Sequence, residues 1–278
     1  MKKARRRAVR RTVFLLLALL LAAGFADSAL RIVTTEYTLR SDGLPAAFDG
    51  FRVVQLSDVH GKAFGEGNAR LLEKVAAARP DLIALTGDLA DADTDLAVID
   101  RLLAGLAEIA PVYYVSGNHE WAAGLLPALS ALFDAHGVRW LRGEALTLAR
   151  GGAEITLAGV DDPNGPHDGL TPDALCDSVA AERPEDFVLL LAHRNDFRTK
   201  YPDLAADVVL CGHAHGGVVR LPFFGGLLGT GRELFPRDTA GAFPSGRYTL
   251  IVSRGLGDAP VPRFCNNPEI VVVILRCA

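Results

Sequence analysis

The 278-residue sequence lacks motifs that mark two common enzyme classes. It has no Gly-x-Ser-x-Gly nucleophile elbow, which removes the usual support for a serine hydrolase. It also has no phosphate-binding loop ending in Gly-Lys-Ser/Thr, which removes the support for a nucleoside triphosphatase. There is no internal repeat and no low-complexity linker, and 50% of the residues are hydrophobic. We therefore expect one globular domain of about 230 to 250 residues with a substantial core.

Cysteine is scarce, and its spacing is uninformative. The four cysteines show no Cys-x-x-Cys motif. Cys211 ends an apolar run and is expected to be a buried thiol. An extracytoplasmic setting would permit a disulfide between Cys265 and Cys277, although nothing in their spacing requires one.

Basic residues are few once the amino terminus is set apart. Seven of the 29 lysines and arginines lie in residues 2–11, which leaves 22 basic against 33 acidic residues for the rest of the chain. A body this acidic does not attract nucleic acid through its overall field. We therefore expect no nucleic-acid partner.

The amino terminus is typical of an export signal. Residues 2–11 carry no acidic residue, and residues 13–26 form an uncharged apolar stretch. This stretch is shorter than the roughly 20 residues of a spanning helix, which favours a signal peptide over a signal anchor. Gly24-Phe25-Ala26 offers a small-x-small cleavage site. Arg10-Arg11 also fits a relaxed twin-arginine signal.

These features divide the chain into three parts. We expect a signal peptide or signal anchor over 1–28, a lead-in segment over 29–49 and the functional domain over 50–278. Either export route places the domain outside the cytoplasm, associated with the membrane or released from it. A cytoplasmic protein with an apolar first helix is the alternative.

Five short apolar runs each end in a polar cluster. The runs are typical of buried strands because they are continuous in apolar and β-branched residues and are bounded by turn formers. They cover residues 51–56, 82–85, 112–115, 187–191 and 208–211. Helical spacing predicts helices over 68–79, 95–108 and 171–181. If the strands are parallel, their carboxyl ends line one rim of a sheet, where ligands bind in open α/β sheets.

The polar clusters contain metal-ligand side chains. They are Asp58-Val59-His60, Gly87-Asp88, Gly117-Asn118-His119-Glu120, His193 and Gly212-His213-Ala214-His215-Gly216. Each cluster alone is an ordinary turn or surface motif, since Gly-Asp is a turn signal and Asn tolerates left-handed backbone. Chance does not readily place five of them at five strand ends, so together they predict a metal site.

The residue types suit two divalent ions. Asp88 is the candidate bridging carboxylate for ions about 3.5–4 Å apart, which can hold the attacking and leaving oxygens of a phosphoryl transfer. Asp58 and His60, two apart in extended backbone, would point to one side and reach one ion. His213 and His215 would offer an imidazole to each ion. Imidazole, carboxylate and amide ligands without thiolate suit Mn, Fe or Zn alike.

The ordered clusters carry a family resemblance. Their order matches Asp-x-His, Gly-Asp, Gly-Asn-His-Asp/Glu, His, Gly-His-x-His, and the chain resembles the calcineurin-like metallophosphoesterase superfamily over residues 51–276. It looks closest to the bacterial membrane-associated phosphodiesterase branch, judging from residues 57–61, 212–217, 252–257 and 267–270. The resemblance implies a four-layer α/β/β/α sandwich.

The resemblance also implies roles for single residues. It assigns Asp58, His60, Asp88 and His215 to one metal, and Asp88, Asn118, His193 and His213 to the other. It implies His119 as the catalytic residue that stabilises the transition state or protonates the leaving group. Glu120 stands where the family has an acidic residue and is expected to orient His119.

Two features fall outside the family pattern. Arg194 would either clamp a phosphate oxygen or be an ordinary surface arginine, and the residue type favours the surface arginine. Asp91, Asp93 and Asp95 resemble a calcium loop, but positions six and twelve of that loop lack the required Gly and Glu. We expect these aspartates to supply a helix start and its favourable negative charge.

The sequence thus predicts an exported, membrane-associated, dinuclear metal-dependent phosphoesterase, most consistent with a phosphodiesterase. The alternative within the class is a lipid-linked pyrophosphatase or phospholipid phosphodiesterase of the cell envelope. A noncatalytic metal-binding envelope protein is the distant alternative, and it is disfavoured because closed structural sites usually use cysteine ligands. The partner is a phosphoester, which could be lipid-linked, and the sequence does not predict an oligomeric state.

One apolar segment follows the His213 and His215 loop. Residues 221–229 include Phe223 and Phe224 and would stand near the mouth of the site. They either rest on a bilayer or cap the core, and the sequence alone slightly favours the cap.

Overall fold

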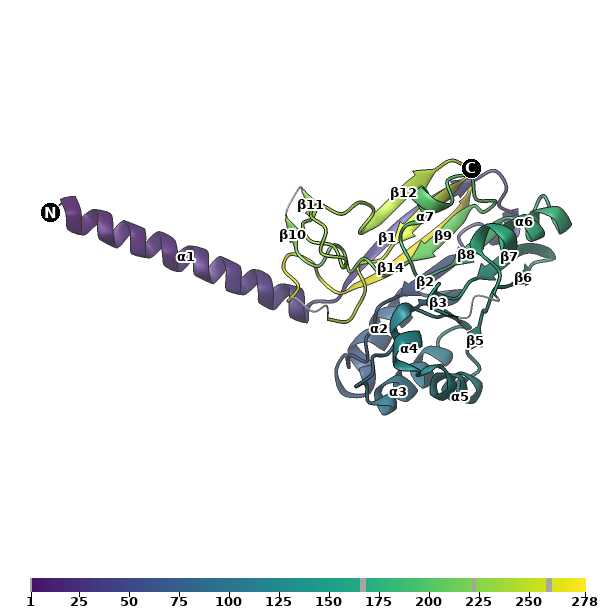
Figure 1. Cartoon of the computed structure of the whole chain (residues 1–278), viewed down its shortest axis with the longest axis horizontal. Helices are drawn as coiled ribbons and strands as arrows, with labels where there is room; N and C mark the ends of the chain where they lie inside the picture. Colours follow the sequence, from purple (N-terminus) through teal and green to yellow (C-terminus); the bar gives the residue numbers. More distant parts are fainter. Residues whose placement is uncertain (1, 166–168, 222–223, 259–261) are drawn as a thin grey trace.

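Two six-stranded sheets face each other in the structure, a computed structural model that describes residues 2–165, 169–221, 224–258 and 262–278 (Figure 1). Sheet A has the order β1 (Val33–Ser41), β14 (Glu269–Cys277), β2 (Arg52–Leu56), β3 (Leu82–Thr86), β4 (Val112–Val115), β5 (Arg139–Trp140). Sheet B has the order β12 (Gly241–Ser245), β13 (Tyr248–Val252), β9 (Val208–Cys211), β8 (Val188–Leu191), β7 (Ala153–Gly159), β6 (Glu144–Arg150). A short third sheet pairs β10 (Arg220–Leu221) with β11 (Gly225–Gly226).

Side chains alternate along the central strands between the two faces of each sheet. In β2, Val53 packs between the sheets, whereas Val54 and Leu56 pack under the outer helices. In β8, Leu189 and Leu191 pack between the sheets. Because both faces of both sheets are covered, the central strands are apolar throughout, which explains the continuous apolar runs in the sequence.

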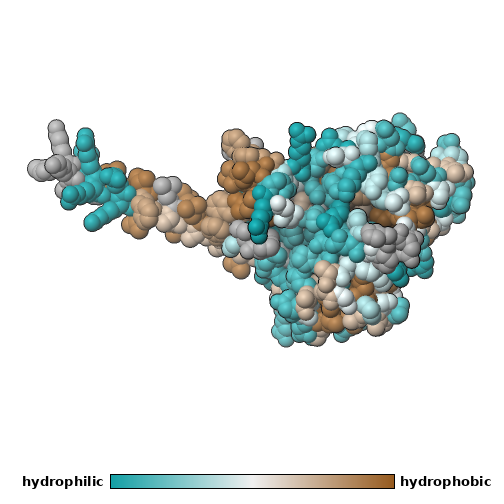
Figure 2. All heavy atoms as spheres, in the orientation of Figure 1, coloured by the Kyte–Doolittle hydropathy of each residue, from teal (hydrophilic) through white to brown (hydrophobic). Residues whose placement is uncertain are grey.

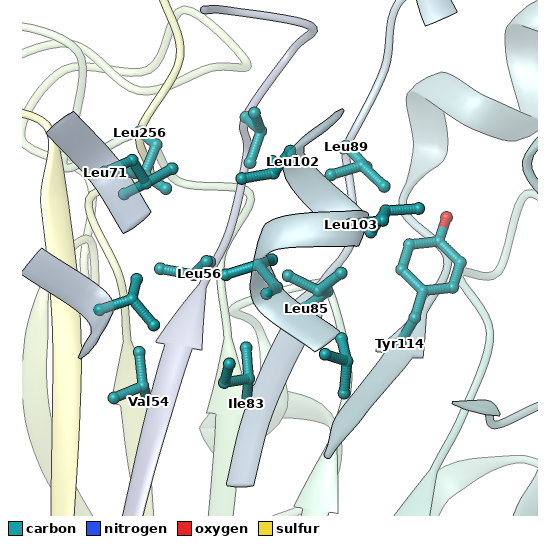
Figure 3. Packing of buried hydrophobic residues seen from close by; sticks show 14 of the residues in the cluster. Val54, Leu56, Leu71, Ile83, Leu85, Leu89, Leu102, Leu103, Tyr114 and Leu256 are labelled. Carbon is teal, nitrogen blue, oxygen red and sulfur yellow. The ribbon is translucent and has the colours of Figure 1, made fainter. Parts of the chain in front are cut away.

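Helices form the two outer layers. Those on sheet A are α2 (Ala69–Ala77), α3 (Leu96–Ala107) and α5 (Leu126–His136); those on sheet B are α6 (Pro172–Glu182) and α7 (Phe197–Lys200); η1 (Ala46–Phe48) and η2 (Glu66–Asn68) are single turns. Figure 3 shows Leu71 of α2 and Leu102 of α3 packed over Leu56 and Leu85 of sheet A. The predicted four-layer α/β/β/α sandwich is confirmed.

The predicted strands are all present, but they do not share one sheet. β2, β3 and β4 are parallel neighbours in sheet A, whereas β8 and β9 are parallel neighbours in sheet B. The expectation of a single rim is therefore wrong. The carboxyl ends of both sets meet at one end of the sandwich, so two rims facing each other form the site.

Sheet A begins earlier in the chain than residue 50. β1 pairs in parallel with β14 over nine residues, from Val33 opposite Glu269 to Ser41 opposite Cys277. Part of the segment 29–49, for which only a lead-in was expected, is thus an edge strand of the core sheet.

All four cysteines are free thiols. Cys211 is fully buried at the end of β9, as predicted. Cys265 and Cys277 do not form the disulfide that an extracytoplasmic setting would permit. The Cys277 thiol instead donates to the Leu44 carbonyl at 3.4 Å.

The helix α1 (Lys2–Leu30) projects from the domain (Figure 1). From Arg5 to Leu30 it is long and apolar enough to cross a membrane, a test that a signal sequence also passes. Its carboxyl end contacts the domain: Ser28 is fully buried, and the Phe25 and Phe264 ring centroids lie 4.9 Å apart.

Candidate metal centre

The residues predicted as ligands lie at five strand ends, where the two sheets meet. Asp58 and His60 follow β2, Asp88 follows β3, Asn118 begins α4 (Asn118–Ala123) after β4, His193 follows β8, and His213 and His215 follow β9. Residues from both sheets thus face one another across the end of the sandwich.

The backbone at five of these positions is left-handed. The φ angle is 50° at Asp58 and at His60, 51° at Asp88, 66° at His213 and 47° at His215. Such angles cost a non-glycine residue on the order of 1 kcal/mol and gather at functional sites. The expectation that Asp58 and His60 converge through extended backbone is therefore wrong, because a sharp turn at each residue brings them together.

One cluster contains Asp58, His60, Asp88 and His215, whose ligand atoms all lie within 4.8 Å of one another. The Nε2 atoms of His60 and His215 are 3.1 Å apart. His215 Nε2 is also 3.6 Å from Asp58 Oδ1. The Asp58 carboxylate accepts the backbone N–H of His213 at 3.0 Å, which ties the loop after β2 to the loop after β9.

A second cluster shares Asp88 with the first. It contains Asp88, His193 and His213, with ligand atoms again within 4.8 Å of one another. His193 Nε2 lies 3.1 Å from Asp88 Oδ2 and 3.2 Å from Asn118 Oδ1. The opposite ring nitrogen, His193 Nδ1, donates to the Thr86 carbonyl at 2.8 Å, which directs Nε2 toward Asp88.

The ionisation of these groups suits bound cations. Burial lowers the pKa of His213 and that of His215 to about 4, so both imidazoles are neutral at pH 7 and offer a lone pair. Burial alone would raise the pKa of Asp88, but the His193 and His60 rings lower it well below its usual range. A carboxylate and neutral imidazoles therefore converge on the same space.

The surroundings of His193 also favour a bound cation. Burial lowers the pKa of His193, but the Asp88 carboxylate outweighs burial and raises it to about 10. A positive charge is thus favoured where His193 Nε2 meets Asp88 and the Asn118 carbonyl oxygen. A divalent ion would take the place of that proton. The nitrogen and oxygen donor set fits two divalent ions.

His119 lies beside the clusters. Its Nε2 is 3.9 Å from Asp88 Oδ2, and its side chain is 47% exposed. Its Nδ1 donates to Asp91 Oδ1 at 2.6 Å, and the same oxygen lies 2.8 Å from His60 Nδ1. The bond to Asp91 is the main cause that raises the pKa of His119. Asp91 therefore orients both rings so that each Nε2 faces the site.

The sequence does not predict this function of Asp91. The three neighbouring aspartates predict a helix start, and that prediction is confirmed only for Asp95, whose side chain caps α3 by accepting the Ala97 N–H at 3.0 Å. The only signal for Asp91 was its closeness in sequence to Asp88, which does not distinguish it from Asp93.

Glu120 does not take the orienting role expected of it. Its buried carboxylate accepts the backbone N–H groups of Gly117 at 3.0 Å and Asp88 at 3.2 Å, and also that of Leu89. It thereby ties the loop after β3 to the start of α4. Burial, assisted by the Asp88 charge, raises the pKa of Glu120 to about 7.

Arg194 is part of the site rather than an ordinary surface arginine. Its Nε and Nη2 donate to the two oxygens of buried Asp162 at 2.6 and 3.1 Å. Its remaining nitrogen, Nη1, lies 3.1 Å from His213 Nε2. Asp162 occupies the Nε–Nη2 edge of the guanidinium, which leaves the Nη1 hydrogens and the second Nη2 hydrogen for other partners.

The segment after β13 supports the Asp58 turn. The backbone N–H of Leu256 donates to the Ser57 carbonyl at 3.0 Å, and that of Gly257 donates to the Asp58 carbonyl at 2.6 Å. Gly255 has φ of 70°, and a Cβ at this residue would lie 2.7 Å from Asp58 Cβ. This contact explains why residues 252–257 belong with the metal-ligand motifs.

The site opens into a cavity of about 960 Å³. Its walls include His60, Asp88, His119 and Arg194, together with the loop residues 228–232. A cavity of this size can take a substrate considerably larger than a phosphate ion.

Comparisons with known proteins support the resemblance. The model of the calcineurin-like phosphoesterase family matches residues 51–217. The metallophosphoesterase YkuE of Bacillus subtilis is 33% identical, covering 88% of this chain and 86% of its own. A metallophosphoesterase of Aquifex aeolicus is 32% identical, covering 87% and 90%. The phosphodiesterase YaeI of Escherichia coli is 27% identical, covering 81% and 82%.

Proposed function

The chain belongs to the calcineurin-like phosphoesterase family, and from that premise we propose that it is a dinuclear metal-dependent phosphodiesterase at the outer face of a membrane. The observation that carries the proposal is the pair of ligand clusters that share Asp88 beside one cavity. A shared carboxylate suits two ions about 3.5–4 Å apart, the spacing used for in-line displacement at phosphorus. The preference for diesters is supported by the similarity to YaeI.

The proposed ligand sets follow the two clusters. Asp58, His60, Asp88 and His215 hold one ion, and Asp88, Asn118, His193 and His213 hold the other. When bound, the ions supply Lewis-acid activation of water and neutralise charge on the phosphoryl oxygens. Mn, Fe and Zn all suit this donor set.

His119 is the proposed general acid. Its Nε2 faces the cavity, while Asp91 holds Nδ1 and raises the pKa of the ring, which favours the protonated form. Transfer of that proton to the departing ester oxygen assists alcohols that are poor leaving groups. The Asp91 bond also prevents the ring from turning its other nitrogen toward the substrate.

Arg194 is the proposed phosphoryl contact. Asp162 fixes the guanidinium through two nitrogens, and Nη1 lines the cavity next to His213. One charge-assisted hydrogen bond from Nη1 to a nonbridging oxygen would orient the ester without displacing the metal ligands.

The helix α1 supports the proposed location. Its segment from Arg5 to Leu30 is long and apolar enough to span a bilayer, and the basic residues lie at its amino-terminal end, within residues 2–11. Basic residues are retained on the cytoplasmic side of membranes, so the domain would lie on the opposite side. Both a cleaved signal and a retained anchor are compatible with this arrangement, and Arg10-Arg11 makes the twin-arginine route the export hypothesis to test.

A substrate panel tests the proposal. Full-length protein in detergent, loaded with Mn²⁺, is assayed with bis(4-nitrophenyl) phosphate, 4-nitrophenyl phosphate, a nucleotide-sugar lipid and a phospholipid, and its metal content is measured by elemental analysis. We expect two ions per chain and a kcat/KM for the aryl diester at least about tenfold above that for the monoester. Two bound ions without hydrolysis of any ester would contradict the enzymatic function. A preference for the monoester would contradict the diesterase.

A further inference from the structure

An apolar patch stands out on the loop after the His213 and His215 turn. Among the described residues outside α1, four large hydrophobic side chains are exposed, and three of them lie on this loop: Phe224 (77%), Leu234 (69%) and Phe235 (61%). We call these three residues the apolar patch. The Phe235 N–H donates to the Leu227 carbonyl at 3.0 Å, so the loop is folded back on itself and presents the patch on a braced backbone.

Part of this patch is predictable from the sequence. Phe223 and Phe224 are expected near the mouth of the site, and the sequence slightly favours a core-capping role for them. Phe223 lies outside the described residues, but Phe224 is exposed and does not cap the core. Leu234 and Phe235 were not anticipated, because neither lies within the segment 221–229.

The loop that carries the patch begins at β10, beside the end of α1, and Phe264 contacts both α1 and β10. The Phe264 ring packs on Phe25 of α1, and the Phe264 carbonyl accepts the N–H of Arg220 at 3.0 Å. Two residues on, the Asn266 side chain donates to the His215 carbonyl at 2.7 Å. Figure 2 shows apolar atoms gathered on the loops where the apolar helix reaches the domain. Residues 264–266 therefore contact the helix α1, the strand β10 that leads into the loop with the patch, and the loop with His215.

The opposite side of the same loop lines the catalytic cavity. Leu228 and Arg232 are among the cavity walls. In the sequence they lie between Phe224 and Leu234. Backbone pairing of Leu228 with Leu234 makes this stretch a narrow hairpin. The loop is thus apolar and exposed on its outer side and faces the phosphoesterase site on its inner side.

We propose that the apolar patch rests on the bilayer that α1 crosses, and that the substrate is an amphiphilic phosphoester. Its apolar tail remains in the bilayer while its phosphoryl group enters the cavity. The substrate class rests on the proposed function, whereas the bilayer contact does not.

The position of α1 indicates that a bilayer covers the apolar patch. The uncharged apolar stretch of α1, residues 13–26, ends at Asp27, which places the membrane surface near Asp27. Ser28 is fully buried, and the Asp27 carbonyl accepts a bond from Asn267 at 2.8 Å, so this level is fixed relative to the domain. Exposed Phe and Leu side chains beside an interface insert readily into it.

Depth measurements test the contact without reference to activity. Full-length protein in which Cys265 and Cys277 are replaced by Ser is given a single new cysteine by Phe224→Cys or Phe235→Cys, labelled with an environment-sensitive fluorophore and reconstituted in phosphatidylcholine and phosphatidylglycerol vesicles. The control is Ser178→Cys on α6, which is exposed at the end of the domain far from α1 (Figure 1). Quenching by lipids brominated high on the acyl chain is then compared.

We expect at least about threefold stronger quenching at 224 and 235 than at 178, because only the patch reaches the hydrocarbon boundary. Equal quenching at all three positions would overturn the proposal. So would a shift of the emission at 224 and 235 without quenching by brominated lipid, which would indicate contact with a second protein copy.

A kinetic comparison tests the substrate class. The triple variant Phe224→Ser, Leu234→Ser, Phe235→Ser is assayed in vesicles with an aryl phosphodiester that carries a hexadecyl chain and with soluble bis(4-nitrophenyl) phosphate. We expect kcat/KM for the tailed ester to fall about tenfold or more and that for the soluble ester to stay within about twofold, since the patch lies outside the cavity walls. The soluble ester reports folding and the basal reaction.

The outcomes separate the two proposals. Unchanged turnover of the tailed ester in the triple variant would overturn the amphiphilic substrate. A wild type that hydrolyses neither ester would contradict the proposed function, while the depth measurements would still decide whether the patch meets the bilayer. Equal loss with both esters would show that the patch supports the fold instead, which would also overturn the substrate class.

Discussion

Asp91→Asn is the change that best tests the geometry of the site. One Asp91 oxygen bonds to His119 Nδ1 at 2.6 Å and to His60 Nδ1 at 2.8 Å. An amide has nearly the shape of the carboxylate but no charge, so the substitution weakens both bonds without opening a cavity. A charge-assisted hydrogen bond contributes about 1.5–3 kcal/mol when well shielded. Because His119 is 47% exposed, water can replace part of its bond, and we take the lower end of that range.

The expected loss follows from that figure. About 1.5 kcal/mol of transition-state stabilisation corresponds to roughly a tenfold decrease in kcat. A contribution from the misoriented His60 ring extends the expected range to about 100-fold. The control is Asp93→Asn, an exposed residue on the same loop, which we expect to leave kcat within about twofold of wild type.

The pH profile carries the sharper test. Asp91 raises the pKa of His119, so the protonated ring persists to higher pH than an isolated histidine would. If that ring is the acid, kcat falls as pH rises through its pKa. In Asp91→Asn this fall should begin at lower pH, and esters with poor leaving groups should lose most. An unmoved profile, or an equal loss for 4-nitrophenyl and alkyl esters, would refute the orienting role of Asp91.

Three further changes test other contacts. Asp88→Asn should remove both ions and lower turnover by at least about 10³-fold, because a neutral amide does not bridge two cations, and two ions per chain by elemental analysis would contradict this. Glu120→Ala should lower the free energy of unfolding by about 2–4 kcal/mol, because four buried backbone N–H groups lose their acceptor; an unchanged Tm would count against it. Arg194→Met should raise KM for the diester about tenfold with metal content unchanged, whereas Arg198→Met, whose guanidinium pairs with Asp238, should have little effect on KM; equal KM values in both variants would exclude the phosphoryl contact.

Much of the scaffold was predictable because it depends on local sequence. Strands covered on both faces must be apolar at every position, so β2, β3, β4, β8 and β9 are visible as short apolar runs. The candidate ligand side chains closely follow these runs, so motif and strand end were found together. The helix start at Asp95 was also predictable, because a cap acts within its own turn.

The partition of the strands between two sheets was not predictable from the runs. An apolar strand in sheet A has the same sequence character as one in sheet B, since both are buried on two faces. The four-layer arrangement came only from the resemblance. The left-handed backbone at Asp58 and His60 was likewise invisible, because it is imposed by packing with neighbouring loops rather than by the residues themselves.

The sequence by itself determined which side chains stand at the strand ends, and hence the chemistry of the site. Only the tertiary structure decided which of the other charged side chains contact the residues of the site. Asp91 meets His60 across 31 residues of chain and Arg194 meets Asp162 across 32, and such pairs have no fixed spacing to recognise. The physical reason is range: strands, turns and caps are set within a few residues, whereas an ion pair across loops exists only once the core has brought the loops together.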